Sequence, residues 1–153
     1  MDIRHQGYQE LLFQEIRTQI VARGMDGVFL DTVADIDEVV ADPLSREEMR
    51  LAYTTFLKKV RGEFPFLLLI QNRAFETLDH SAPHLDGVLW EDWRGDLLAD
   101  PWVQVQLGRL RAHKKPAGLR VFAVSAGLEP IHRETAQAQG FVHLSRPDGY
   151  DRL

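Results

Sequence analysis

The sequence contains no cysteine. Disulfide bonds, thiolate ligands and a cysteine nucleophile are therefore excluded, while the compartment stays open because the absence fits the cytosol and the exterior alike. No apolar run approaches the roughly 20 residues that a membrane-spanning helix needs. The N-terminus also lacks the basic and then apolar layout of a signal peptide. We therefore expect no membrane partner, and the sequence does not specify a localisation.

An excess of basic residues is lacking as well. The 153 residues include 18 Lys and Arg against 23 Asp and Glu, a net charge of -5. Nucleic-acid-binding proteins usually present a basic face, so this balance argues against such a partner. With 44% hydrophobic and 27% charged residues, the composition is that of an ordinary globular chain. Residues 1–153 have the length of one domain, which is short for a complete α/β barrel.

Several common kinds of site lack their motifs. No predicted strand is followed by a GxGxxG or GxxxxGK[ST] phosphate loop, and the six histidines show no metal-ligand spacing. We therefore expect no cofactor and no metal. Ser125 lacks the first glycine of a G-x-S-x-G elbow. Asp31 lacks the second aspartate that phosphoryl-transfer hydrolases carry two residues later, where this chain has Val33.

What the sequence does contain is one short pattern in two copies. Residues 25–31 and 85–91 each consist of an apolar residue, Asp-Gly, three apolar residues and a carboxylate, which is Asp31 or Glu91. The Asp-Gly pair predicts a turn, and the apolar run predicts a buried strand. Each acid then lies at the carboxyl end of a strand, where α/β folds build their sites. We therefore predict that Asp31 and Glu91 work as a pair.

Hydrophobic periodicity predicts an α/β fold in which helices alternate with strands. The expected helices cover residues 8–23, a segment from Ser45 (capped with Glu48) to about residue 60, residues 101–113 after an Asp100 cap, and residues 129–139. The five expected strands cover residues 28–30, 66–70, 88–90, 119–124 and 141–144. Such alternation implies parallel strands joined by right-handed crossovers. Residues 32–44 are expected to form a long, functional loop that contains at most one helical turn.

Glycoside hydrolysis suits a carboxylate pair with aromatic and amide neighbours, because it needs one protonated acid and one ionised carboxylate. Glu91 lies between Trp90 and Trp93, and apolar surroundings favour the neutral acid. We therefore predict Glu91 as general acid/base and Asp31, followed by Thr32 and a polar loop, as nucleophile or stabiliser. Both tryptophans are expected to be exposed, so that sugar rings can stack on them. The alternative is that the two acids only cap following helices.

Residues 24–33, 68–72 and 85–92 together resemble glycoside hydrolase family 114, the endo-α-1,4-polygalactosaminidase-like proteins. Residues 2–4 resemble the stretch before the fourth barrel strand of that family. The resemblance covers nearly the whole chain and implies a (β/α)8 TIM-type barrel, a galactosamine-containing polysaccharide as substrate, and Asp31 and Glu91 as the catalytic residues. The expected substrate-binding residues are Gln71, Asn72, Trp90, Asp92 and Trp93.

The sequence also departs from that family. Ala34 stands where a second Asp is common, and Arg73 stands where Gly often follows the Gln-Asn pair. The resemblance begins just before the fourth strand, so we expect only the C-terminal part of the barrel, with about five parallel strands, open sheet edges and an uncovered apolar face. Such a truncated chain is either a fragment or pairs with a second copy or with a partner chain that completes the barrel.

Two other interpretations stay open. One is a non-catalytic carbohydrate-binding or scaffold remnant of such a barrel, for which binding without turnover, unaffected by Glu91→Gln, would be evidence. The other is a standalone open-sheet α/β domain of different function, for which a stable monomer would be evidence. The sequence does not specify the sugar, the linkage or the stereochemical outcome.

Overall fold

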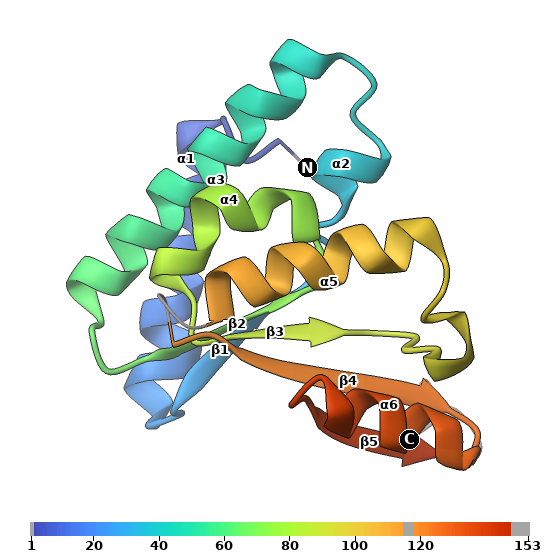
Figure 1. Ribbon diagram of the computed structural model, residues 1–153. Helices are drawn as coiled ribbons and strands as arrows, with labels where there is room; N and C mark the ends of the chain where they lie inside the picture. Colours follow the sequence, from blue (N-terminus) through green and yellow to red (C-terminus); the bar gives the residue numbers. More distant parts are fainter. Residues whose placement is uncertain (1, 115–117, 148–153) are drawn as a thin grey trace.

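The computed structural model describes residues 2–114 and 118–147, and one five-stranded sheet forms its centre (Figure 1). All pairings are parallel and the strand order is β1-β2-β3-β4-β5. The strands are β1 (Gly27–Leu30), β2 (Leu68–Asn72), β3 (Gly87–Trp90), β4 (Arg120–Ala126) and β5 (Val142–Arg146). Because each strand pairs with the next one in the chain, the sheet is singly wound, as in the wall of a barrel. The α/β class and the five parallel strands predicted from the sequence are confirmed.

Helical segments precede every strand. α1 (Gln6–Glu15) continues into the π-helical η1 (Ile16–Ile20) and the 3-10 turn η2 (Val21–Arg23) before β1. The segments that follow β1 are α2 (Asp35–Glu38) and α3 (Pro43–Glu63); those that follow β2 are η3 (Phe75–Thr77), α4 (Leu78–Ser81) and η4 (Ala82–His84); those that follow β3 are η5 (Gly95–Leu97) and α5 (Pro101–Lys114); and α6 (Pro130–Ala138) follows β4. Figure 1 shows α3, α4 and α5 along one side of the sheet. None of the helices in the described ranges is long and apolar enough to cross a membrane.

One face of the sheet carries the core. Residues that alternate along the strands toward this face are buried, including Leu69 and Gln71 of β2 and Val88 and Trp90 of β3. The apolar ones join a single cluster with residues of the covering helices, such as Leu57, Leu78 and Leu107. The helix stripe predicted for α3 is confirmed, since its buried residues are Met49, Tyr53, Phe56, Leu57 and Val60.

The opposite face, here called the open face, is apolar and largely uncovered. Its outer residues are Phe29 on β1 (51% exposed), Leu68 on β2 (48%), and Val142 (59%) and Leu144 (56%) on β5. Half-buried residues lie between them on the middle strands: Ile70, Leu89, Phe122 and Val124. Parallel sheets are normally covered on both faces. An exposed apolar face is the expected consequence of a barrel wall that is not closed.

The glycines of the repeated pattern have a different role from the predicted turn. Neither Gly27 nor Gly87 has a positive φ, and each is the first residue of its strand. A Cβ added to Gly27 would lie 2.7 Å from the carbonyl oxygen of Leu68, and one added to Gly87 would lie 2.9 Å from the ring of Phe122. Glycine is required there because the neighbouring strand approaches closely.

Two predicted boundaries are wrong in an informative way. α3 begins at Pro43, because the Asp42 carboxylate accepts a hydrogen bond from the Ser45 N–H at 2.7 Å and so caps the helix before Ser45. β2 runs two residues further than expected, from Leu68 to Asn72, while Phe66 lies before it and is exposed. The shift in β2 places Asn72 inside the strand and not after it.

Candidate functional site

The carboxyl ends of β1, β2 and β3 bring Asp31, Asn72 and Glu91 together. The Asn72 Nδ2 donates one hydrogen bond to Asp31 Oδ1 at 2.9 Å and another to Glu91 Oε2 at 2.8 Å. The two carboxylate oxygens are therefore at most about 5.7 Å apart, which is the sum of the two bond lengths. An ideal amide, whose two N–H bonds diverge by about 120°, gives a separation of about 5 Å.

The register of the sheet explains this meeting. Leu30 pairs with Gln71, so that Asp31 follows at the level of Asn72. Asn72 in turn pairs with Leu89, two residues before Glu91. The two acids of the repeated pattern therefore lie at the same edge of the sheet, with one strand between them.

The other polar atom of the Asn72 amide, Oδ1, has no hydrogen-bond partner in the described part of the chain. The residue is 8% exposed, and its Oδ1 is buried without a hydrogen bond from any described residue. An unsatisfied buried acceptor costs about 1–3 kcal/mol. The reverse orientation of the amide would direct Oδ1 at two carboxylates, so the bridging N–H groups fix the assignment. A buried acceptor without a partner is the kind of feature that functional sites retain.

Strained backbone surrounds the same three residues. Thr32 follows Asp31 with φ 59°, Arg73 follows Asn72 with φ 49°, and Asp92 follows Glu91 with φ 56°. Together with Ala74 these are all the non-glycine residues of positive φ in the described part of the chain. Each left-handed residue of this kind costs on the order of 1–3 kcal/mol and such residues cluster at active sites.

Hydrogen bonds within the strand ends hold the carboxylates in place. The Thr32 N–H donates to Asp31 Oδ1 at 2.7 Å, so that this oxygen accepts two hydrogen bonds. Asp31 is exposed, whereas Glu91 is half-buried. The site therefore contains one carboxylate in contact with solvent and one partly withdrawn from it, about 5 Å apart.

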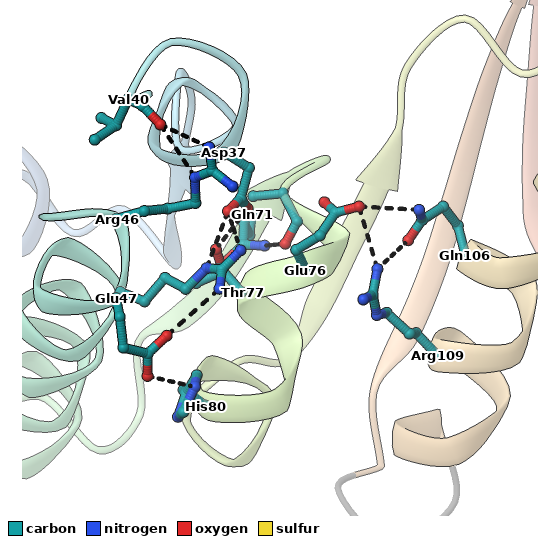
Figure 2. A network of polar contacts seen from close by, with 12 residues as sticks. Asp37, Val40, Arg46, Glu47, Gln71, Glu76, Thr77, His80, Gln106 and Arg109 are labelled. Carbon is teal, nitrogen blue, oxygen red and sulfur yellow. Dashed lines mark hydrogen bonds and ion pairs between the residues drawn. The ribbon is translucent and has the colours of Figure 1, made fainter. Parts of the chain in front are cut away.

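A polar network holds α2, the segment after β1, against its neighbours (Figure 2). Arg50 of α3 forms an ion pair with Asp37 of α2, and the Thr77 hydroxyl donates to the other oxygen of Asp37 at 3.2 Å. Arg73, which directly follows Asn72, pairs with Glu38 of α2 at 2.7 Å. These contacts fix the loop after Asp31 relative to the end of β2.

Gln71 lies on the core face and points away from the carboxylates, because side chains alternate along a strand. It is completely buried, and its Oε1 accepts a hydrogen bond from the Tyr53 hydroxyl at 3.0 Å. Its Nε2 donates to the carbonyl oxygens of Arg73 at 2.9 Å and Ala74 at 3.1 Å. Burial raises the pKa of Tyr53, so this hydroxyl remains a neutral donor. Gln71 thus supports the strained turn after Asn72, and the predicted sugar contact finds no free polar atom on it.

The two tryptophans are buried, so the expectation that they are exposed is wrong. Trp93 has 0% exposure, and its Nε1 donates to the carbonyl oxygen of His132 at 2.9 Å. Trp90 is 4% exposed, with its ring centre 5.0 Å from that of Trp93 and 4.6 Å from that of Phe75. Trp90 lies on the core face of β3, and α6 covers Trp93. Neither ring offers an exposed face on which a sugar could stack.

Asp92, the last predicted substrate-binding residue, is exposed and lines a cavity of ≈ 540 Å³. Arg94, Glu129 and His132 line the same cavity. His132 was not predicted from the sequence; it is 5% exposed, and its Nδ1 accepts a hydrogen bond from the Gly95 N–H at 3.1 Å. A second cavity, lined by Asp31, lies along β1.

No model of a known protein family matches the sequence, and no curated protein matches it. The structure is similar to that of the glycoside hydrolase domain of PelA from Pseudomonas aeruginosa, with a TM-score of 0.72, 24% sequence identity, and coverage of 96% of this chain and 63% of that chain. A glutamate-to-alanine variant of the same domain gives a TM-score of 0.71 with the same identity and coverage. The chain thus spans less than two thirds of these solved domains, and it has the fold of the matching part of a glycoside hydrolase domain.

Proposed function

We propose that this protein is a glycosidase-like hydrolase whose reacting groups are Asp31 and Glu91. The observation that carries the proposal is the Asn72 amide, which bridges the two carboxylates at 2.9 and 2.8 Å. Retaining glycosidases keep their two carboxyl groups about 5–5.5 Å apart, whereas inverting ones leave about 6.5–9.5 Å. A separation of about 5 Å fits the retaining class.

The roles of the two acids follow from their surroundings. Asp31 is exposed, and its Oδ1 is held by two N–H donors, which suits a nucleophile that must attack a sugar carbon from one direction. Glu91 is half-buried and suits the acid that protonates the leaving oxygen. In the second step Glu91 takes a proton from water, and the resulting hydroxide displaces Asp31 from the glycosyl ester.

We propose a galactosamine-containing polysaccharide as the substrate class. The resemblance of residues 24–33, 68–72 and 85–92 to glycoside hydrolase family 114 supports it. The likeness to a solved glycoside hydrolase domain supports the broader class. Asn72 and Asp92 stay as proposed substrate contacts, since Asn72 touches both acids and Asp92 lines the neighbouring cavity.

We further propose that the active form contains more than one copy of this chain or a partner chain. The open face exposes apolar side chains that a closed barrel would bury, among them Phe29 and Leu144. The chain also spans only 63% of the PelA glycoside hydrolase domain. A partner would cover this face and complete the walls around the carboxylates.

Release of reducing ends from α-1,4-linked galactosamine oligosaccharides tests the proposal. Glu91→Gln and Asp31→Asn should each lower turnover at least a thousandfold, because each removes a group that reacts. Glu134→Gln is the matched control, since Glu134 is exposed on α6, and turnover should not change. Thermal unfolding should show all three variants folded. Unchanged turnover in Glu91→Gln would remove that residue from the mechanism.

The uncovered face also favours a second candidate, a carbohydrate-binding or scaffold remnant of a barrel. Its mark is binding of the same oligosaccharides without release of reducing ends. Binding that Glu91→Gln leaves unchanged would favour this candidate over the hydrolase.

A further inference from the structure

β1 is an edge strand that borders an apolar cavity. Among the described strands it pairs only with β2, so its other edge presents unpaired backbone N–H and C=O groups. A cavity of ≈ 540 Å³, here called the β1 cavity, lies along this edge. Its lining includes Val28 and Leu30 of β1, Leu12 of α1, Ile16 of η1 and Met49 of α3.

These features together suit an extended polypeptide more than a small ligand. Apolar side chains line the β1 cavity on several sides, from α1, η1, the segment after β1 and α3. An edge strand offers a row of hydrogen-bonding groups that an added strand satisfies, while the cavity walls receive alternate side chains of that strand. Backbone pairing with pockets for alternate side chains is the usual form of strand addition to a sheet.

The charges along the β1 cavity select among possible partners. The charged residues that line it are all acidic: Glu15 of α1, Asp31 directly after β1, and Asp35 of α2. No lysine or arginine is among the described residues of the lining. A second copy of this chain would place the same acids against these three, which is unfavourable. A strand that carries lysine or arginine at its ends would complement them.

The edge of β1 also continues into the open face. Phe29 lines the β1 cavity and is 51% exposed, and Leu68 of β2, which pairs with Gly27 of β1, is 48% exposed. The similar PelA domain contains additional chain, since this protein matches 63% of it. A strand added at β1 would therefore lie where the sheet, the cavity and the apolar face all lack a neighbour.

We propose that a partner polypeptide adds a β-strand to the free edge of β1, with apolar side chains in the β1 cavity and basic residues near Asp31 and Asp35. This inference rests on the partner part of the proposed function and states the chemistry of that partner. Asp31 and Thr32 line the β1 cavity, so the added strand forms a wall beside the carboxylate pair. The partner thereby becomes part of the site.

Two synthetic peptides test the proposal on the purified chain. Each has eight alternating valine and threonine residues, and the ends carry lysine in one peptide and glutamate in the other. Fluorescence anisotropy should show at least tenfold tighter binding of the lysine peptide. Hydrogen–deuterium exchange should show slowed exchange of the β1 amides that do not bond to β2. A lysine peptide with N-methylated backbone amides should give no protection.

Matched variants separate charge from fold. Asp35→Asn should reduce the preference for the lysine peptide at least threefold, whereas Glu134→Gln on α6 should leave it unchanged. Protection by neither peptide, or equal affinity for both, would overturn the proposal. A dimer in light scattering with β1 already protected would assign the edge to a second copy and overturn it too. None of these readouts depends on hydrolysis, so failure of the hydrolase proposal would be distinguishable.

Discussion

At the scale of single residues, the site depends on one amide that serves two acids. Asn72 donates its two N–H bonds to Asp31 and Glu91, while its own oxygen is buried without a partner among the described residues. Such an arrangement lowers stability, because an apolar side chain of the same size would leave no buried acceptor without a partner. It does fix the distance and the orientation of the two carboxylates.

The bridging role of Asn72 can be tested by replacing its amide with a carboxylate and then replacing the carboxylate of Asp31 with an amide. Asn72→Asp replaces two donors by a third carboxylate against two others, and we expect a loss of about 2 kcal/mol in the free energy of unfolding. Adding Asp31→Asn returns one amide donor and should recover about half of the loss. Urea unfolding of the four proteins in the double-mutant cycle measures this coupling. Strictly additive effects would mean that Asn72 and Asp31 do not interact.

Much of this site could be predicted from the sequence, and the part that could not has a physical reason. Asp31 and Glu91 each follow an apolar run, which predicts a strand. Because parallel strands end on the same side of the sheet, the local pattern was enough to predict that both acids lie at the carboxyl ends of strands. The burial of Trp93 depends on α6, because its hydrogen-bond partner His132 lies 39 residues later in the chain. The left-handed backbone at Thr32 and Arg73 depends on tertiary contacts. It could not be predicted from the local sequence, because neither position is a glycine.

At the scale of elements, α2 ties the end of β1 to the rest of the site. Its Asp37 is held by Arg50 of α3 and by Thr77 of η3, and its Glu38 by Arg73. The side chain of Asp37 is 9% exposed and that of Arg50 is 20% exposed, so this pair is shielded from solvent. Shielded pairs of this kind are costly to break from one side.

Breaking this pair should loosen the segment after Asp31. Arg50→Met keeps the apolar stem but leaves Asp37 without its cation, and we expect a loss of about 2 kcal/mol in unfolding free energy. Arg17→Met is the control, because Arg17 and its partner Glu63 are about half exposed, and it should cost less than about 1 kcal/mol. Urea unfolding gives both values, and hydrogen exchange should rise across 32–40 in Arg50→Met alone. Equal costs for the two variants would contradict the anchoring role of Arg50.

At the scale of the whole molecule, the sheet is a barrel wall with one covered and one open face. The sequential strand order and the helices that precede each strand fit such a wall, and the partial barrel predicted from the sequence agrees with a chain that matches 63% of a solved glycoside hydrolase domain. A partner could cover the exposed apolar side chains of the open face and pair with the free edge of β1. The carboxylate pair lies at the rim between these surfaces.

The stereochemistry of the first product tests the central claim most directly. In proton NMR of an α-1,4-linked galactosamine oligosaccharide during hydrolysis, a carboxylate pair about 5 Å apart predicts that the α-anomer appears first. The signal should be lost in Glu91→Gln. First appearance of the β-anomer would contradict the account.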